Sequence, residues 1–281
     1  MILKALMALT GIVICLPAQA DIMLTFGTYA SDKPTTMVKK FRPILNVLEQ
    51  ELEALTAEKV KIKLHIARNY QIGLENIISG KVDIARLGPA SYIKAKERSE
   101  GIQLLVMESN KGKKRFNGVI CTRVGSKFNK IEDLQGSRFA FGNQRSTIGR
   151  YLSQSYLMKH GLYAKNFAEF SYLGRHDKVG HAVLKGDFDA GALKEGTFKK
   201  LIKKGKPLKA LAEFENVTKP WVARSGLTES IREKLTAALL NITDKKALSA
   251  LKKDGFLNGK DSDYNFVRRS IKNNHRFFQG N

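Results

Sequence analysis

Cysteine is almost absent from the sequence. Among its 281 residues only Cys15 and Cys121 carry a thiol, and Cys15 lies in a segment that we expect to be removed. The mature chain then has one thiol and cannot form an internal disulfide, so its stability must come from ordinary burial. The remaining length is sufficient for two lobes.

Long apolar runs are missing after the first twenty residues. Lys4 precedes a largely apolar stretch at residues 5–17, and Ala18-Gln19-Ala20 gives a small-x-small cleavage site before Asp21. This pattern predicts a secretory signal peptide at residues 1–20. Ile14 does not fit a lipoprotein signal, which needs a small residue before the cysteine. Since no later run approaches about eighteen apolar residues, we expect a soluble protein in the periplasm.

Acidic residues are few relative to basic ones. The chain has 26 Asp and Glu against 49 Lys and Arg, a formal net charge of +23. Such a field attracts small oxyanions, anionic lipid headgroups or nucleic acid. Short basic clusters lie at residues 111–115, 199–209 and 268–276, but none is interleaved with aromatic side chains that stack bases. We therefore expect no nucleic-acid partner, since a solvated basic surface explains each cluster. The electrostatic field of the whole protein can still steer an anion towards a cleft.

The familiar motifs of catalysis and metal binding are also missing. No Gly-Lys-Ser/Thr completes a nucleotide-binding loop, and no Gly-x-Ser-x-Gly elbow is present. His176 and His181 are five residues apart, which does not place them on one helix face as a metal pair requires. We expect no enzyme activity, no metal site and no cofactor.

What the sequence has is a repeated alternation of strand and helix patterns. Short apolar strands alternate with amphipathic helices twice, with strands expected at 23–29, 60–67, 82–87, 104–108 and 116–122, then at 138–142, 170–173 and 187–192. Residues 208–214 and 221–224 are the last expected strands, and a helical tail follows. Helices expected in the second half include 146–160 and 195–203. The pattern predicts an α/β protein, and the first three strands with their helices imply a parallel sheet covered by helices.

The repetition predicts two lobes joined by crossing strands. We expect one lobe at residues 21–117 with 216–281, including the C-terminal helices, and the second at residues 118–215. Two such lobes in a secreted chain are typical of a hinged protein that closes around a small ligand in the cleft between them.

One stretch predicts an anion site. Residues 139–149, Phe-Ala-Phe-Gly-Asn-Gln-Arg-Ser-Thr-Ile-Gly, indicate a buried strand, a tight turn and the start of a helix. The first N–H groups of a helix have no partner within it, and the helix dipole leaves about half a positive charge there. Ser146 and Thr147 add two hydroxyl donors for an oxyanion. The simpler alternative is that one of them only caps the helix.

Several segments resemble a known family. The stretches Asn69-Tyr70, 75–85 and Gly88-Pro89-Ala90-Ser91-Tyr92 are similar to the phosphate/phosphite/phosphonate substrate-binding proteins of ABC transporters. Four further segments agree in order, namely 27–29 with 32–34, 133–136 with 139–149, 174–177 and 186–192. The resemblance covers nearly the whole mature chain, and the set is specific although each piece alone is weak.

The resemblance implies a two-lobed type II periplasmic-binding-protein fold with a ligand cleft between the lobes. It also implies residues that hold a phosphorus oxyanion: Ser146 and Thr147 at the helix start, Tyr70 and Tyr92 from the first lobe, and His176 and the acidic Asp189 from the second. The tyrosines could equally be wall residues, and Asp189 could accept from the backbone at the hinge.

Two positions depart from the family pattern. Ile148 stands where similar members usually have a second serine, and Asn143 replaces an acid that is common at the strand end. The first change removes a hydroxyl from the oxyanion site, and the second makes the local field more positive.

The sequence thus predicts a monomeric periplasmic protein that captures a phosphonate, phosphite or phosphate ion for an inner-membrane ABC permease. Three alternatives stay open. The same fold could dock on a sensor kinase or chemoreceptor, Ser146 and His176 could serve a hydrolase, or the charge could bind a lipid or nucleic-acid surface. The sequence does not distinguish the three phosphorus oxyanions.

Overall fold

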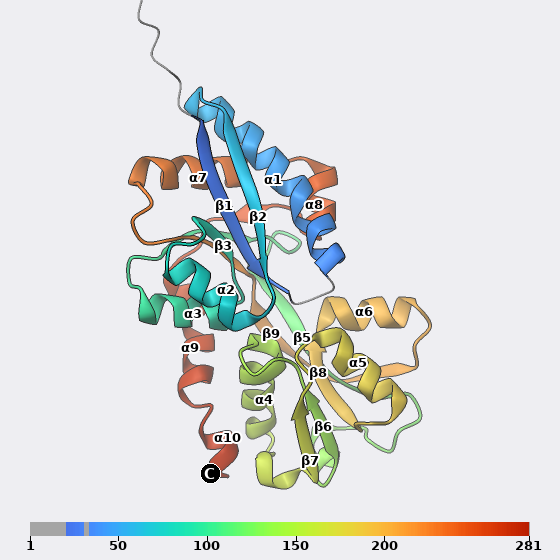
Figure 1. Cartoon of the computed structure of the whole chain (residues 1–281). Coiled ribbons are helices and arrows are strands. Elements are labelled where there is room, and N and C mark those ends of the chain that lie inside the picture. Colours follow the sequence, from blue (N-terminus) through green and yellow to red (C-terminus); the bar gives the residue numbers. More distant parts are fainter. Residues whose placement is uncertain (1–20, 31–33, 281) are drawn as a thin grey trace, which may run out of the picture.

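The computed structural model describes residues 21–30 and 34–280, which form two α/β lobes (Figure 1). The predicted signal peptide at residues 1–20 lies outside the described residues. The strands form two separate sheets, in the orders β11-β4-β10-β3-β1-β2 and β7-β6-β8-β5-β9. Each sheet is the centre of one lobe.

The first sheet is mixed. Its parallel part is β1 (Ile22–Tyr29), β2 (Val60–Ala67) and β3 (Ile84–Arg86). The other three strands are β4 (Gln103–Glu108), β10 (Pro220–Ala223) and β11 (Phe256–Leu257), and β10 runs antiparallel to both β3 and β4. The parallel sheet predicted from the first three strands is therefore confirmed, and later segments of the chain add antiparallel strands to it.

Helices cover both faces of this sheet. One group packs as α1 (Pro34–Thr56), α7 (Glu229–Asn241) and α8 (Lys245–Leu251). The apolar positions of α1, spaced by three and four, are buried: Met37, Phe41, Leu45, Leu48 and Leu52. Pro43 lies inside α1 without ending it. The helices α2 (Tyr70–Ile78) and α3 (Pro89–Arg98) pack against each other and belong to a different cluster of buried residues.

The second sheet carries the predicted anion site. Its strands β6 (Arg138–Phe141), β7 (Glu169–Tyr172) and β8 (Ala190–Lys194) are parallel, whereas β5 (Arg115–Arg123) is antiparallel to β8 and to β9 (Leu208–Val217). Its helices are α4 (Ser153–Lys159), α5 (His176–Lys185) and α6 (Glu195–Lys203), with short helical turns η1 (Ile131–Leu134), η2 (Thr147–Leu152) and η3 (Ala164–Asn166).

The chain passes between the sheets twice, after β4 and after β9. The two passages are bonded together, since Thr218 N donates to Lys114 O at 2.9 Å. The second passage is also bonded to the first sheet, because Glu108 N donates to Lys219 O at 3.0 Å. The lobe limits at 117/118 and 215/216 stay a prediction, as does a hinge at these passages.

The C-terminal segment ties the lobes together on another side. After η4 (Asp261–Tyr264), helix α9 (Asn265–Lys272) packs on α3 and η2, and α10 (Arg276–Gln279) reaches the second lobe (Figure 1). The ring of Phe277 lies among those of Phe141, Phe167 and Phe170. The expectation that residues 221–224 form the last strand was wrong, because Phe256–Leu257 pairs with β4; two residues carry no detectable period.

Candidate functional site

The junction of β6 and the following helix is held by two glycines. Gly142 N donates to Gly149 O at 2.9 Å, and a Cβ added to Gly149 would lie 2.7 Å from the Cα of Gly142. Only glycine allows this approach, which presses the helix start against the strand end. The helix predicted at 146–160 is confirmed as Thr147–Lys159, and its first part, η2, is a π-helix. Such turns occur often at functional sites.

The two hydroxyls at this helix start are already used as acceptors. Ser146 Oγ accepts from Gly149 N at 3.0 Å and caps the helix, while Thr147 Oγ1 accepts from Ala90 N of α3 at 2.9 Å. The second bond joins the two lobes. A hydroxyl that accepts still has its proton to donate, so capping and oxyanion binding do not exclude each other. The amides of Thr147 and Ile148, as the first two of the helix, have no acceptor within it.

A small cavity adjoins this junction. It measures about 30 Å³, where about 10–15 Å³ suffices for one water molecule. Both lobes and the second passage line it: Tyr29, Tyr70, Gly88, Pro89, Phe116, Ser146, Thr147, Ile148, His176, Lys194, Asn216 and Lys219. The structure therefore brings together four of the six predicted site residues, namely Tyr70, Ser146, Thr147 and His176.

Two stacked tyrosines form the first-lobe wall. The rings of Tyr29 and Tyr70 lie 4.0 Å apart. Tyr29 Oη accepts from Gly88 N at 2.6 Å and lies 3.2 Å from Ser91 Oγ, which holds the start of α3 in place. Burial raises the pKa of both phenols, so both keep their protons at neutral pH. Asn69 positions Tyr70 by capping α2, since its Oδ1 accepts from Ile72 N at 2.9 Å.

His176 faces the cavity as a neutral, unsatisfied ring. It is the first residue of α5 and 7% exposed, and its buried Nδ1 has no hydrogen-bond partner within the described structure. Burial lowers its pKa well below the usual value, and the nearby Lys194 and Lys219 lower it further. A buried ring nitrogen without a partner costs free energy. In the tautomer with the proton on Nδ1, this nitrogen could donate to an oxyanion in the cavity.

Lysines at the cavity are the residues that the sequence reasoning missed. Lys194 ends β8, and Lys219 lies between β9 and β10. Lys194 could have been found, because side chains after the carboxyl ends of parallel strands collect around ligands. Nothing in the sequence separates Lys219 from the many surface lysines.

A buried ion pair lies near Lys219. Arg86 Nε and Nη2 bond Glu108 Oε1 and Oε2 at 2.6 and 3.0 Å, and both side chains are at most 5% exposed. Burial alone would raise the pKa of Glu108, but Arg86 and Lys253 hold it at about 2. Because Arg86 already satisfies this carboxylate, Glu108 compensates little of the charge on the lysines.

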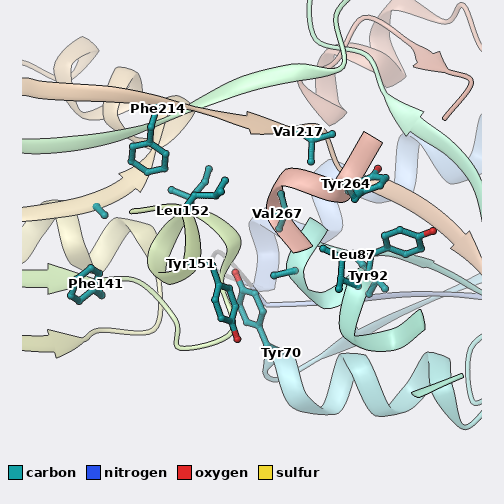
Figure 2. Close-up of a cluster of buried hydrophobic side chains, with 14 of the residues drawn as sticks. Tyr70, Leu87, Tyr92, Phe141, Tyr151, Leu152, Phe214, Val217, Tyr264 and Val267 are labelled. Atoms are coloured by element: carbon teal, nitrogen blue, oxygen red, sulfur yellow. The ribbon is translucent and has the colours of Figure 1, made fainter. Parts of the chain in front are cut away.

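Tyr92 and Asp189 lie away from the cavity. Tyr92 Oη donates to Asp261 Oδ1 at 2.8 Å, and its ring packs 4.9 Å from that of Tyr264; Figure 2 shows it beside Tyr264 and apart from Tyr70. Asp189 forms an ion pair with Arg138 at 2.9 Å.

The positions of these two residues in their elements explain why they lie away from the cavity. Asp189 precedes β8 and so lies at the amino end of that strand, while the cavity gathers residues beyond carboxyl ends. Tyr92 lies on the face of α3 that packs on α9. We leave both out of the site proposed below.

Ile148 forms an apolar wall of the cavity. It is 4% exposed, and a Cβ added to Gly118 of β5 would lie 2.9 Å from its Cγ2 and 2.4 Å from the ring of Phe214. Its side chain is therefore also part of the core beneath β5. Asn143, the other departure, accepts from Arg145 N at 2.9 Å through its Oδ1 and so supports the turn.

Neither a metal-binding cluster nor a membrane-spanning helix is found among the described residues. Within residues 21–30 and 34–280 no group of three or more His, Cys, Asp or Glu side chains could hold a metal ion. In the same part of the chain no helix has the length and apolar character needed to cross a bilayer.

Comparisons with known proteins show the family of this chain. Residues 26–264 match the family model described as ABC transporter, phosphonate, periplasmic substrate-binding protein. A probable ABC transporter phosphite binding protein, PhnD1 of Prochlorococcus marinus (strain MIT 9301), is 24% identical over 241 residues, which are 80% of this chain and 78% of that protein. The phosphonates-binding periplasmic protein of Escherichia coli (strain K12) is 25% identical over 240 residues, or 80% and 68% of the two chains.

Solved structures share the fold. PhnD1 from Prochlorococcus marinus, solved in complex with methylphosphonate, superposes with a TM-score of 0.76 at 22% identity, covering 89% of this chain and 97% of that one. The predicted type II fold with two lobes is confirmed. Since the family model spans most of the sequence, the chain belongs to the periplasmic phosphonate substrate-binding proteins of ABC transporters.

Proposed function

We propose that this protein binds a compact phosphorus oxyanion, such as phosphite, phosphate or a small phosphonate, in the cavity between the lobes and delivers it to an ABC permease. The observation that carries the proposal is the helix start at Ser146 and Thr147, which faces the same cavity as the unpartnered Nδ1 of His176. The relatives named for phosphite and phosphonate binding support the substrate class.

The binding mechanism follows from the origin of each donor. Tyr70 comes from the first lobe, and Ser146, Thr147 and His176 come from the second. An oxyanion can contact all of them only when the lobes are closed, so it stabilises the closed state over the open one. The bond from Ala90 N to Thr147 Oγ1 adds a direct contact between lobes in the same state.

We propose binding without catalysis. A hydrolase would need a base beside Ser146, yet Ser146 Oγ bonds Gly149 N and the Nδ1 of His176 has no partner within the described residues. The arrangement holds an anion and supplies no activated nucleophile. We further propose that the protein acts as a monomer in the periplasm.

A ligand-dependent shift in thermal unfolding tests the proposal. Phosphite, phosphate, methylphosphonate and 2-aminoethylphosphonate are added separately, and a ligand at about 100 times its Kd should stabilise the protein by about 2.7 kcal/mol. Asp189→Asn is the matched control, since Asp189 lies away from the cavity. If none of the four raises Tm while another solute does, the substrate class is wrong.

A further inference from the structure

We propose that the protein has a second anion site beside the substrate cavity, which takes a diphosphate or a longer polyphosphate group and favours closure of the lobes. The site is a cavity of about 340 Å³ between α2 and α3 of the first lobe and the start of η2 in the second. This inference goes beyond the proposed function, which concerns only the small cavity.

The two cavities share no lining residue, and hydrogen bonds close the wall between them. Ala90 lines the larger cavity and donates its N–H to Thr147 Oγ1, which belongs to the small one. Ser91 Oγ, on the larger side, lies 3.2 Å from the hydroxyl of Tyr29 on the small side. A ligand in the larger cavity therefore does not occupy the place proposed for the phosphorus oxyanion.

The lining of the larger cavity is cationic on both sides. Spacings of four residues place Ala90, Lys94 and Arg98 on one face of α3, and the second lobe contributes Arg145 and Arg150. The other lining residues carry no charge: Gln71, Leu74, Ser91, Gln144 and Tyr151. Guanidinium groups bind phosphate oxygens through paired hydrogen bonds, so three arginines and a lysine around one cavity fit a phosphorylated anion.

Carboxylates outside the lining compensate the two cations of the first lobe. Lys94 pairs with Glu97 at 2.8 Å, and Arg98 pairs with Glu75 at 2.6 Å. All four side chains are more than 40% exposed, so both cations can exchange these weak partners for an anion. The hydrogen bond from Arg98 lowers the pKa of Glu75, and the positive charges of Arg98 and Arg145 lower it further. Arg145 of the second lobe therefore lies near this pair.

The two cations of the second lobe form no ion pair with any described carboxylate. Arg150 Nε donates to Asn274 Oδ1 at 2.8 Å, and its Nη1 donates to Gln144 O at 3.1 Å. These acceptors are neutral, so they fix the guanidinium group without balancing its charge. The Arg145 side chain is exposed and has no hydrogen bond within the part of the chain that the structure describes. An anion with two or more negative charges balances both groups.

The volume and the position of the cavity indicate the ligand and its effect. About 340 Å³ is within the range of small-molecule sites, about 300–1,000 Å³, and the small cavity has about 30 Å³. Two linked phosphoryl groups supply the charge that the lining lacks, and both walls can contact them at once. Because the walls belong to different lobes, such an anion binds the closed state better than the open one. By linkage it also tightens the binding of the substrate.

Calorimetric titration of the ligand-free protein with inorganic diphosphate tests the site. The wild type should bind one diphosphate. Arg145→Gln leaves the fold intact, because the side chain is exposed, and it should weaken this binding about tenfold or more by removing a charge-assisted contact. The exposed Lys206, between α6 and β9, gives the matched control. Lys206→Gln removes one charge from the same lobe and should leave the diphosphate affinity within about twofold, since salt screens distant charges.

A second titration measures the coupling between the two cavities. Saturating diphosphate should tighten methylphosphonate binding about fivefold or more. Arg145→Gln should remove this gain and leave the affinity measured without diphosphate within about twofold. Competition between the two anions overturns the inference. Absence of diphosphate binding, equal effects of the two variants, or a methylphosphonate affinity that diphosphate does not change overturns it as well. Since the first titration needs no substrate, a protein that binds diphosphate but no small phosphorus oxyanion would overturn the proposed function and support this site.

Discussion

Replacing Thr147 by Val tests the two roles that one hydroxyl has in the site. Valine has nearly the same shape as threonine, so the packing of this buried residue, 6% exposed, is retained. The change removes the acceptor for Ala90 N, which lies 2.9 Å from Thr147 Oγ1. It also removes the proton that we assign to the bound oxyanion.

The expected loss combines two contributions. A hydrogen bond to a charged ligand contributes about 1.5–3 kcal/mol, and a buried N–H without an acceptor costs about 1–3 kcal/mol. The second cost falls on the closed state, because opening the lobes exposes Ala90 N to water. Since neighbouring effects are not fully additive, we expect a total of about 2–4 kcal/mol, or roughly a 30- to 1,000-fold rise in Kd.

Calorimetric titration with methylphosphonate measures this loss, and two variants act as controls. Thr147→Ser keeps the oxygen and should bind within about fivefold of the wild type, as a retained hydrogen bond implies. Ser146→Ala removes a helix cap as well as a donor, so it should also lower the stability of the ligand-free protein by about 1 kcal/mol. A Thr147→Val protein that binds methylphosphonate within about threefold of the wild type would refute both roles.

Three titratable groups give further predictions. Lys219→Met should raise the Tm of the ligand-free protein, because it removes a buried ammonium whose pKa is lowered chiefly by burial and further by the positive charges of Arg86 and Lys194; a lower Tm contradicts this. The pKa of His176 lies well below 6.5 in the folded protein, owing chiefly to burial. The free energy of unfolding should therefore fall as the pH drops below about 6.5. His176→Asn should reduce that fall, which urea titrations at two pH values can measure. Glu108 has a pKa of about 2 instead of 4.5, so the stability that it contributes is complete above pH 4.5 and is lost towards pH 2. At neutral pH, Glu108→Gln should lower the free energy of unfolding by about 3–5 kcal/mol, because it leaves Arg86 buried without a charged partner. Denaturant unfolding measures this loss.

Local patterns in the sequence were sufficient for most of the fold. The strand at 60–67 and the helix at 195–203 have the predicted limits, because a strict alternation and an apolar stripe mark them. The segment at 187–192 was placed too early, as β8 starts at Ala190. There the Gly186-Asp187 turn and the strand share small and apolar residues, and pairing with β5 and β6 decides where the strand begins.

The sequence was sufficient for those parts of the candidate site that depend on neighbouring residues in the chain. Ser146 and Thr147 follow a strand and begin a helix, so the local pattern alone predicts their place at a helix start, where anions can bind. Tyr92 and Asp189 could not be judged in this way. Their environments depend on Asp261 and Arg138, which lie 169 and 51 residues away in the chain, and no local pattern indicates such pairs.

The positions of the cations explain why closure should depend on the ligand. Arg86 and Lys40 belong to the first lobe, Lys194 belongs to the second, and Lys219 lies on a passage between them. Burial lowers the pKa of Lys219, and the positive charges of Arg86, Lys194 and Lys40 lower it further, so we expect these charges to oppose the closed state when no anion is bound. This effect would act against the Thr147–Ala90 contact and the burial of the tyrosines.

We expect a bound oxyanion to reverse the balance, because its negative charge attracts the two lysines that line the same small cavity. The differential affinity for the closed state, on which any ligand-driven shift depends, would thus come largely from charge. In the proposed binding mode, the neutral donors at Ser146, Thr147 and His176 fix where the oxygens lie. Charge and hydrogen bonding accordingly act on different steps, the first on closure and the second on the orientation of the anion.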